Sequence, residues 1–202
     1  MNELIAIFIF FFAVIDPIGT VPVFIAVTSH YDAAIKRKIA IKATLVSALI
    51  LVFFVVAGEV ILTAIDIPLS AFQIAGGIVL FLFALTMIFG ESKPEQEVKL
   101  ADNMSQTAIF PLAVPSIASP GAMLAAVMMT ENNQFNFLEQ VETTVVMLTV
   151  LAITLILMLA ASSIHRLIGN SGASIISRVM GLILASVATA NVLAGIKLYF
   201  SL

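Results

Sequence analysis

Six long apolar stretches take up most of this chain of 202 residues. A helix needs about 20 apolar residues to cross the hydrocarbon core of a membrane, and each stretch is about that long. The stretches lie near residues 5–28, 40–62, 72–90, 107–129, 143–164 and 179–200. The 61% hydrophobic and 10% charged residues are typical of a membrane protein. The sequence therefore predicts an all-α integral membrane protein with six transmembrane helices, forming a single domain over residues 1–202.

Two of the six stretches are interrupted by a proline that follows a polar residue. The first interruption reads Asp16-Pro17-Ile18-Gly19, and the second reads Ser119-Pro120-Gly121, with the two prolines 103 residues apart. Proline breaks the interior of a helix but suits its first position, and Asp and Ser are favoured capping residues just before that position. We therefore predict that a new half-helix starts at each interruption, so that transmembrane helices 1 and 4 are discontinuous.

Small residues recur along the chain at the same spacing as the two breaks. Gly77 matches Gly181 at a separation of 104, and Thr86 matches Thr189 at a separation of 103. Each half then holds three spans, and because three is odd, the second half must enter the membrane the other way round. We predict two inverted three-helix repeats, over about residues 1–90 and 107–202, joined by a polar linker over about residues 91–106.

The basic residues favour one orientation in the membrane. Eight of the nine lie on one side of the predicted topology: Lys36, Arg37, Lys38, Lys42, Lys93, Lys99, Arg166 and Arg178, of which the last two flank the predicted turn between the fifth and sixth spans. The opposite side holds Lys197 and several acidic residues. The positive-inside rule assigns the basic side to the cytoplasm. We predict a multi-pass protein of the inner (cytoplasmic) membrane with both termini on the outer, periplasmic side.

The two breaks carry the chemistry that suggests a binding site. The first turn of a half-helix exposes backbone N–H groups with partial positive charge, and inverted symmetry brings the two starts together near the middle of the membrane. Such facing helix starts favour an anionic group. Asp16 is an acidic residue deep within a span, where an ionisable side chain is costly and suggests function. It can cap its half-helix, carry a proton or bind a substrate ammonium group, and the sequence leaves these roles open.

The candidate substrate-binding residues are the break residues and polar side chains on the same spans. They are Asp16, Pro17, Ile18, Gly19, Thr20, Ser116, Ser119, Pro120, Gly121 and Asn191. Asp16 is also the candidate residue for proton coupling. Isolated Ser and Thr side chains in membrane helices usually bond to their own backbone or to a neighbouring helix, so Thr20 and Ser116 have a structural alternative.

Other classes of site find little support in the sequence. The chain has no cysteine, and its two histidines, His30 and His165, have no partner at a metal-binding spacing, so we expect neither a metal site nor a cofactor. No nucleophile and base stand in a recognisable catalytic pattern, so we expect no enzyme, and nothing calls for nucleic acid. The expected partners are the lipid bilayer, a small solute and protons or another coupling ion. Self-association into a homo-oligomer stays open.

Five short motifs resemble the MarC family along nearly the whole chain. They are Asp16-Pro17-Ile18-Gly19, Ala75-Gly76-Gly77-Ile78, Pro111-Leu112-Ala113-Val114-Pro115, Ser119-Pro120-Gly121 and Ser177-Arg178-Val179-Met180-Gly181. The resemblance implies a six-helix inner-membrane protein related to the LysE-type amino acid exporters. It also implies transport of small neutral amino acids such as glycine or alanine at discontinuous helices 1 and 4. Many relatives look to have glycine where this chain has Ser119, which bears on substrate selection.

These lines together predict a secondary transporter of small neutral amino acids that alternates access by rocking of its two halves. An exporter of hydrophobic drugs is an alternative, with a larger cavity lined by phenylalanines such as Phe10, Phe11 and Phe24. A channel or a non-transporting membrane scaffold is a further alternative from another class. A channel would pass substrate downhill without exchange, and a scaffold would bind no small solute.

Overall fold

The computed structural model describes residues 2–29, 31–89, 108–132 and 135–200, and every regular element among them is helical. The elements are α1 (Asn2–Ile15), α2 (Pro17–Thr28), α3 (Ala33–Ala64), α4 (Leu69–Phe89), η1 (Ala108–Ile117), α6 (Pro120–Met128), α7 (Phe137–Leu159) and α8 (Ala161–Tyr199). The predicted linker over residues 91–106 and His30 lie outside the described residues.

The helices have the length and apolar character that membrane spanning requires. Five spans in the described part of the chain pass this test, and the bent pair of η1 and α6 makes a sixth. Their outward faces are apolar: Leu45, Leu49 and Phe53 of α3 are each more than half exposed. Since water would oppose such a surface and lipid would not, the fold is that of an all-α integral membrane protein, as predicted.

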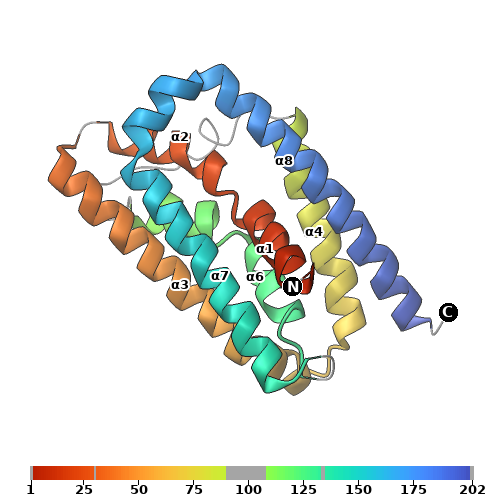
Figure 1. The fold of residues 1–202 in the computed structure, drawn as a ribbon. Helices are drawn as coiled ribbons and strands as arrows, with labels where there is room; N and C mark the ends of the chain where they lie inside the picture. The colour runs from red at the N-terminus through yellow and green to blue at the C-terminus, as the bar shows by residue number, and fades with distance from the viewer. Residues whose placement is uncertain (1, 30, 90–107, 133–134, 201–202) are drawn as a thin grey trace.

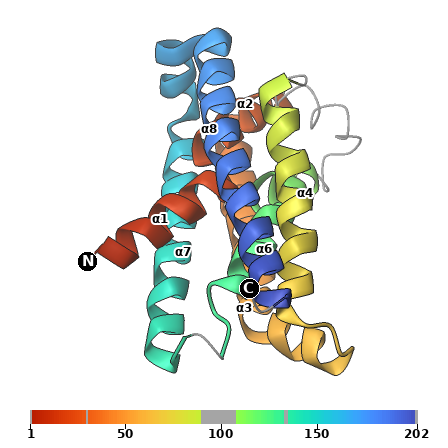
Figure 2. The same cartoon turned by 90° about the vertical axis from the view of Figure 1, so that its right-hand side faces the viewer.

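The two broken helices lie between two pairs of long helices. On one side α3 runs beside α7, and on the other α4 runs beside α8, with α1, α2 and α6 between these pairs (Figure 1). We call the end of the molecule where α3 begins, with Lys36, Arg37, Lys38 and Lys42, the basic end. The end where α3 stops, with Glu59, Asp66 and Glu131, is the acidic end. α1 leaves the bundle sideways between the two ends (Figure 2).

The interface between α4 and α8, which we call the seam, contains the same glycine–alanine contact twice, with the two helices exchanged. A Cβ atom added to Gly77 would lie 3.0 Å from the carbonyl oxygen of Ala188, and one added to Gly181 would lie 3.1 Å from that of Ala84. Ala84 and Ala188 are 104 residues apart, as are Gly77 and Gly181. An antiparallel pair related by a two-fold axis must exchange its contacts in this way, and the small residues allow the backbones to approach closely.

One part of the predicted topology is wrong. The sequence suggested a turn between Arg166 and Arg178, but α7 ends at Leu159, the chain turns at Ala160, and α8 then runs continuously to Tyr199. His165, next to the expected turn, also lies within this helix. The apolar span of α8 begins at Arg178, so residues 161–177 form a helical extension at the basic end (Figure 2). Arg166 therefore lies within this extension and Arg178 directly follows it, and neither residue flanks a loop.

Candidate functional site

The first break is organised around Asp16. This residue adopts a left-handed backbone conformation, with φ 51° and ψ 66°, which Asp tolerates better than most residues. Its amide still bonds to the carbonyl oxygen of Phe12 and so ends α1, while its own carbonyl accepts the Thr20 amide at 3.1 Å and so starts α2. The carboxylate folds over the new helix start, where Oδ1 accepts the Gly19 amide at 2.9 Å. Asp16 therefore caps α2, as the sequence predicted.

Gly19 is needed for this cap. A Cβ atom at position 19 would overlap the carboxylate of Asp16, which lies directly over the helix start. Gly19 thus leaves room for a charged cap that a larger residue would push aside. The adjacent Thr20 turns its hydroxyl back to the carbonyl oxygen of Asp16 at 3.0 Å, so the break also satisfies this polar side chain locally.

The second break uses a neutral cap and a longer irregular approach. Ser119 has an extended backbone, and its hydroxyl oxygen accepts the Ala122 amide at 3.1 Å at the start of α6. Before it, η1 contains two extended residues, Phe110 and Val114, each directly followed by a proline that disfavours helical geometry. The α6 axis is bent by 56° from that of η1. Both predicted breaks are therefore present, and their caps differ in charge.

The two breaks lie against each other although they are far apart in sequence. The hydroxyl of Ser119 donates to the carbonyl oxygen of Val14 at 3.0 Å, across 105 residues. The hydroxyls of Thr20 and Ser116 lie 3.4 Å apart, which joins the breaks a second time. Asp16, Thr20, Ser116 and Ser119 are all at most 1% exposed. They form a closed polar cluster, which we call the central cluster, inside an otherwise apolar bundle.

The backbone N–H groups in the first turns of α2 and α6 are the hydrogen-bond donors that a ligand between the breaks would meet. Pro17 and Pro120 have no N–H, and the amides of Thr20 and Met123 bond to the carbonyl oxygens of the capping residues. The caps themselves take the amides of Gly19 and Ala122. The first-turn donors that neither cap takes are therefore Ile18 on α2 and Gly121 on α6, one from each half of the chain.

The predicted site residues do not all come together. Nine of them form the two breaks and their surroundings, where Pro17, Gly19 and Gly121 are buried, Ile18 is half-buried and Pro120 is exposed. Asn191 lies on α8, on the same helical stripe as Ala188 and Gly195, which face α4. Its side-chain amide nitrogen is buried with no hydrogen-bond partner in the described part of the structure, and no described hydrogen bond joins it to the breaks. Asn191 thus belongs to the α4–α8 side of the bundle.

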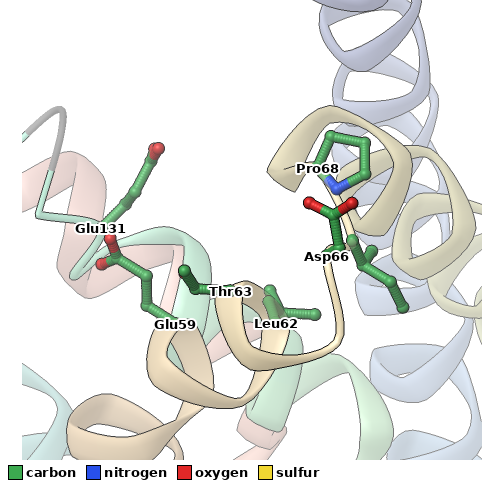
Figure 3. A pocket seen from close by; sticks show the side chains of 7 residues that line it. Glu59, Leu62, Thr63, Asp66, Pro68 and Glu131 are labelled. Atoms are coloured by element: carbon green, nitrogen blue, oxygen red, sulfur yellow. The ribbon is translucent and has the colours of Figure 1, made fainter.

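A second polar region lies at the acidic end and was given no role from the sequence. A pocket of about 470 Å³ is lined there by Glu59, Asp66 and Glu131 together with Leu62, Thr63, Ile67 and Pro68 (Figure 3). Glu131 is only 5% exposed, and Asp66 has a left-handed backbone with φ 56°. Glu131 lies 65 residues beyond Asp66 in the chain, which is why its approach to Glu59 and Asp66 was not found from the sequence.

The fold and these breaks define a multi-pass integral membrane protein with a broken helix in each half. The description "MarC family integral membrane protein" matches residues 1–200, and the chain belongs to that family. A UPF0056 membrane protein of Methanocaldococcus jannaschii is 35% identical over 92% of each chain, and the UPF0056 inner membrane protein YhgN of Escherichia coli is 32% identical over 98% of each chain. A UPF0056 membrane protein of Bacillus subtilis, YvbG, is 33% identical over 96% of this chain and 94% of its own. No solved structure matches the chain.

Proposed function

We propose that this protein is a secondary transporter of small neutral amino acids, of the glycine and alanine class, which alternates access around its two broken helices. One observation carries the proposal: two half-helix starts, capped by Asp16 and Ser119, meet in a buried polar cluster. Broken helices that meet inside a membrane bundle are a recurrent way to build a substrate site in transporters.

The carboxylate of an amino acid fits the donors that the caps leave over. Ile18 and Gly121 each contribute a first-turn N–H, one from each half, so a carboxylate between the half-helices would accept one hydrogen bond from each. The partial positive charge at both helix starts adds electrostatic stabilisation. A ligand held in this way touches both halves at once, which is the arrangement that couples substrate binding to their relative movement.

The ammonium group of the substrate fits the first break. Asp16 carries the one carboxylate of the central cluster, whereas Ser119 caps the other half-helix without charge. An amino acid would therefore bind with its ammonium group toward Asp16 and its carboxylate toward α6. The same carboxylate is the candidate for proton coupling, because protonation would remove the partner of the ammonium group and so favour release.

The surroundings of the central cluster favour a small side chain. Gly19, Ala113, Ala118 and Ala122 are buried around the breaks, so a larger substrate would meet backbone at short range. The cluster is also closed in this conformation, which supports a carrier that must separate its halves to admit substrate. In a permanently open channel, the polar residues along the path would be exposed, whereas Asp16 and Ser119 are at most 1% exposed here.

The experiment that tests the proposal is counterflow in liposomes containing the purified protein. Vesicles loaded with unlabelled glycine or alanine receive a trace of labelled substrate outside, and a carrier accumulates the label transiently. We expect accumulation with the native chain and a large loss with Asp16→Asn. Glu142→Gln is the matched control, because it removes one carboxylate from an exposed position on α7. Label that only equilibrates would indicate a channel, and no response to any small amino acid would contradict the proposed substrate class.

The proposed sidedness places the basic end in the cytoplasm. The C-terminal part of α8 packs beside the start of α4, because a Cβ atom added to Gly195 would lie 3.0 Å from the carbonyl oxygen of Ser70. The start of α4 lies at the acidic end, so the last turns of α8 lie there too and are proposed to face the outside. The cysteine-free sequence makes the test direct. Cysteine introduced at Asp66 should react with an impermeant maleimide added outside intact cells, and cysteine at Lys38 should not. The opposite pattern would reverse the proposed orientation.

A further inference from the structure

A crevice on the lipid-facing side of the bundle has a composition that the central cluster does not explain. It lies between α3 and α7 near the acidic end and has a volume of about 380 Å³. Its lining includes Val52, Val56 and Val145, and also the polar residues Glu59, Asn132 and Gln140. α3 and α7 run side by side along one side of the bundle (Figure 1). Val56 and Val145 in the lining are each more than half exposed, so the crevice opens on the apolar outer face, where lipid surrounds the protein.

The lining of the crevice becomes more polar from its deep end, inside the membrane, toward its mouth at the acidic end. α3 runs toward the acidic end, so Val52 lies deepest in the membrane and Glu59 lies seven residues nearer the surface, about 10 Å along the helix axis. α7 runs the opposite way, so Val145 lies at the deep end and Gln140 nearer the mouth. Thr130 and Thr144 also line the crevice, but their hydroxyls bond to nearby backbone carbonyl oxygens, and the remaining lining residues, Val55, Phe137 and Val141, are apolar. The carboxylate and amide side chains therefore all lie toward the mouth, which suits a molecule with an apolar part and a polar headgroup, as a membrane lipid has.

The mouth of the crevice selects for positive charge. Glu59 is half-buried, and one carboxylate oxygen accepts the Asn132 amide at 2.7 Å, which fixes the side chain at the mouth. Glu59 also lines the neighbouring acidic pocket with Asp66 and Glu131 (Figure 3). Among the described residues that line the crevice and this pocket, none is lysine, arginine or histidine. An anionic headgroup would be repelled here, and a cationic group would be attracted.

We propose that this crevice binds a phospholipid with a primary amine headgroup, phosphatidylethanolamine, from the leaflet at the acidic end. The ammonium group donates a charge-assisted hydrogen bond to Glu59, and an acyl chain lies along Val52, Val56 and Val145. A primary ammonium has three N–H donors, whereas the quaternary ammonium of phosphatidylcholine has none, so the site distinguishes two lipids that carry the same net charge. Phosphatidylglycerol has no ammonium group, and its negative charge disfavours binding at the acidic mouth.

Native mass spectrometry of the purified full chain tests this proposal with lipids of identical acyl chains. Phosphatidylethanolamine, phosphatidylcholine and phosphatidylglycerol are each added at matched concentrations, and the bound fraction is measured. We expect phosphatidylethanolamine to bind about fivefold more tightly than the other two. Glu59→Gln should remove about that fivefold preference, the size expected for one charge-assisted hydrogen bond at a half-buried site.

Two further variants separate this site from general lipid contact. Glu142→Gln removes a carboxylate of α7 that does not line the crevice, and it should leave the preference unchanged. Val145→Phe fills the crevice at a position that is already 56% exposed, and it should weaken phosphatidylethanolamine binding while Glu59 is intact. Glutamine at position 59 keeps an oxygen for the Asn132 amide, so the fold is expected to survive. Equal binding of the three lipids, or equal effects of the Glu59 and Glu142 variants, would overturn the proposal.

Discussion

The hydroxyl of Ser119 donates to the carbonyl oxygen of Val14 at 3.0 Å while its oxygen accepts the amide of Ala122 at 3.1 Å. One side chain thus starts the half-helix of the second break and holds the end of α1 at the first. Val14 needs such a donor because α1 ends at Ile15 and α2 begins separately at Pro17, which leaves carbonyl groups of the last turn of α1 without their usual partners. The tie joins the end of α1 to the start of α6, so a movement that separates these two helix ends must break it.

Ser119→Ala is therefore expected to lower the stability of the fold and also to shift the central cluster from its closed state toward an open one. The variant leaves a buried carbonyl and a buried amide without their partners, which costs about 1–3 kcal/mol for each group in a buried setting. Thermal unfolding in detergent should show a lower midpoint. The reactivity of a single cysteine placed at Ala118, which is fully buried beside the second break, should rise as the central cluster opens more often.

Ser163→Ala is the control for this prediction, since Ser163 is exposed on α8. It should change neither the unfolding midpoint nor the cysteine reactivity. If Ser119→Ala matched this control in both measurements, the hydrogen bond to Val14 would not hold the two breaks together.

Gly19→Ala is expected to displace the cap of α2. The new Cβ would overlap the carboxylate of Asp16, so either the carboxylate leaves the Gly19 amide or the break moves. Losing an N-cap of this kind costs about 1 kcal/mol. The measurement is the unfolding midpoint in detergent, and counterflow should weaken in parallel.

The second break provides the comparison for the Gly19 variant. The matching position there is already alanine, Ala122, because the hydroxyl of Ser119 is smaller than a carboxylate. Gly121→Ala meets only the flexible end of Leu80 and should cost less than Gly19→Ala. Equal losses in the two variants would show that crowding of the cap is not what requires glycine at position 19.

Asp16→Asn separates the capping role of Asp16 from its charge. Asn caps helices as well as Asp does and tolerates the left-handed conformation, so α2 should still start at Pro17. The unfolding midpoint should stay near that of the native chain, whereas Asp16→Ala should lower it by the cost of a lost cap, about 1 kcal/mol. Counterflow should be lost in both variants, because neither has the carboxylate that the ammonium group requires. Full activity of Asp16→Asn would leave this residue with a structural role alone.

The parts of the fold that depend on local chemistry were predictable from the sequence. Pro17 and Pro120 end a helix by their own geometry, and Asp16 and Ser119 are strong caps, so both breaks were placed correctly. The bond from Ser119 to Val14 depends on how the two halves pack, and no local pattern encodes it. The turn at Ala160 was missed because residues 165–177 contain two glycines, three serines and an asparagine, which suggest a loop, whereas the structure continues them as helix. The side of the bundle on which Asn191 lies was likewise set by tertiary packing.

The repeated seam of α4 and α8 leads to the last prediction. Gly77 faces the backbone of Ala188, and Gly181 faces that of Ala84, at 3.0 and 3.1 Å from the position that a Cβ would occupy. Backbone cannot rotate away as a side chain can, so Gly77→Ala and Gly181→Ala should each push the helices apart at a cost of about 1–3 kcal/mol. Ser186→Ala is the control, because Ser186 is exposed on α8 and does not face this seam. If the two halves are inverted copies, the first two variants should lower the unfolding midpoint by similar amounts and the third by less; a clear difference between Gly77→Ala and Gly181→Ala would mean that the seam is not symmetric in energy.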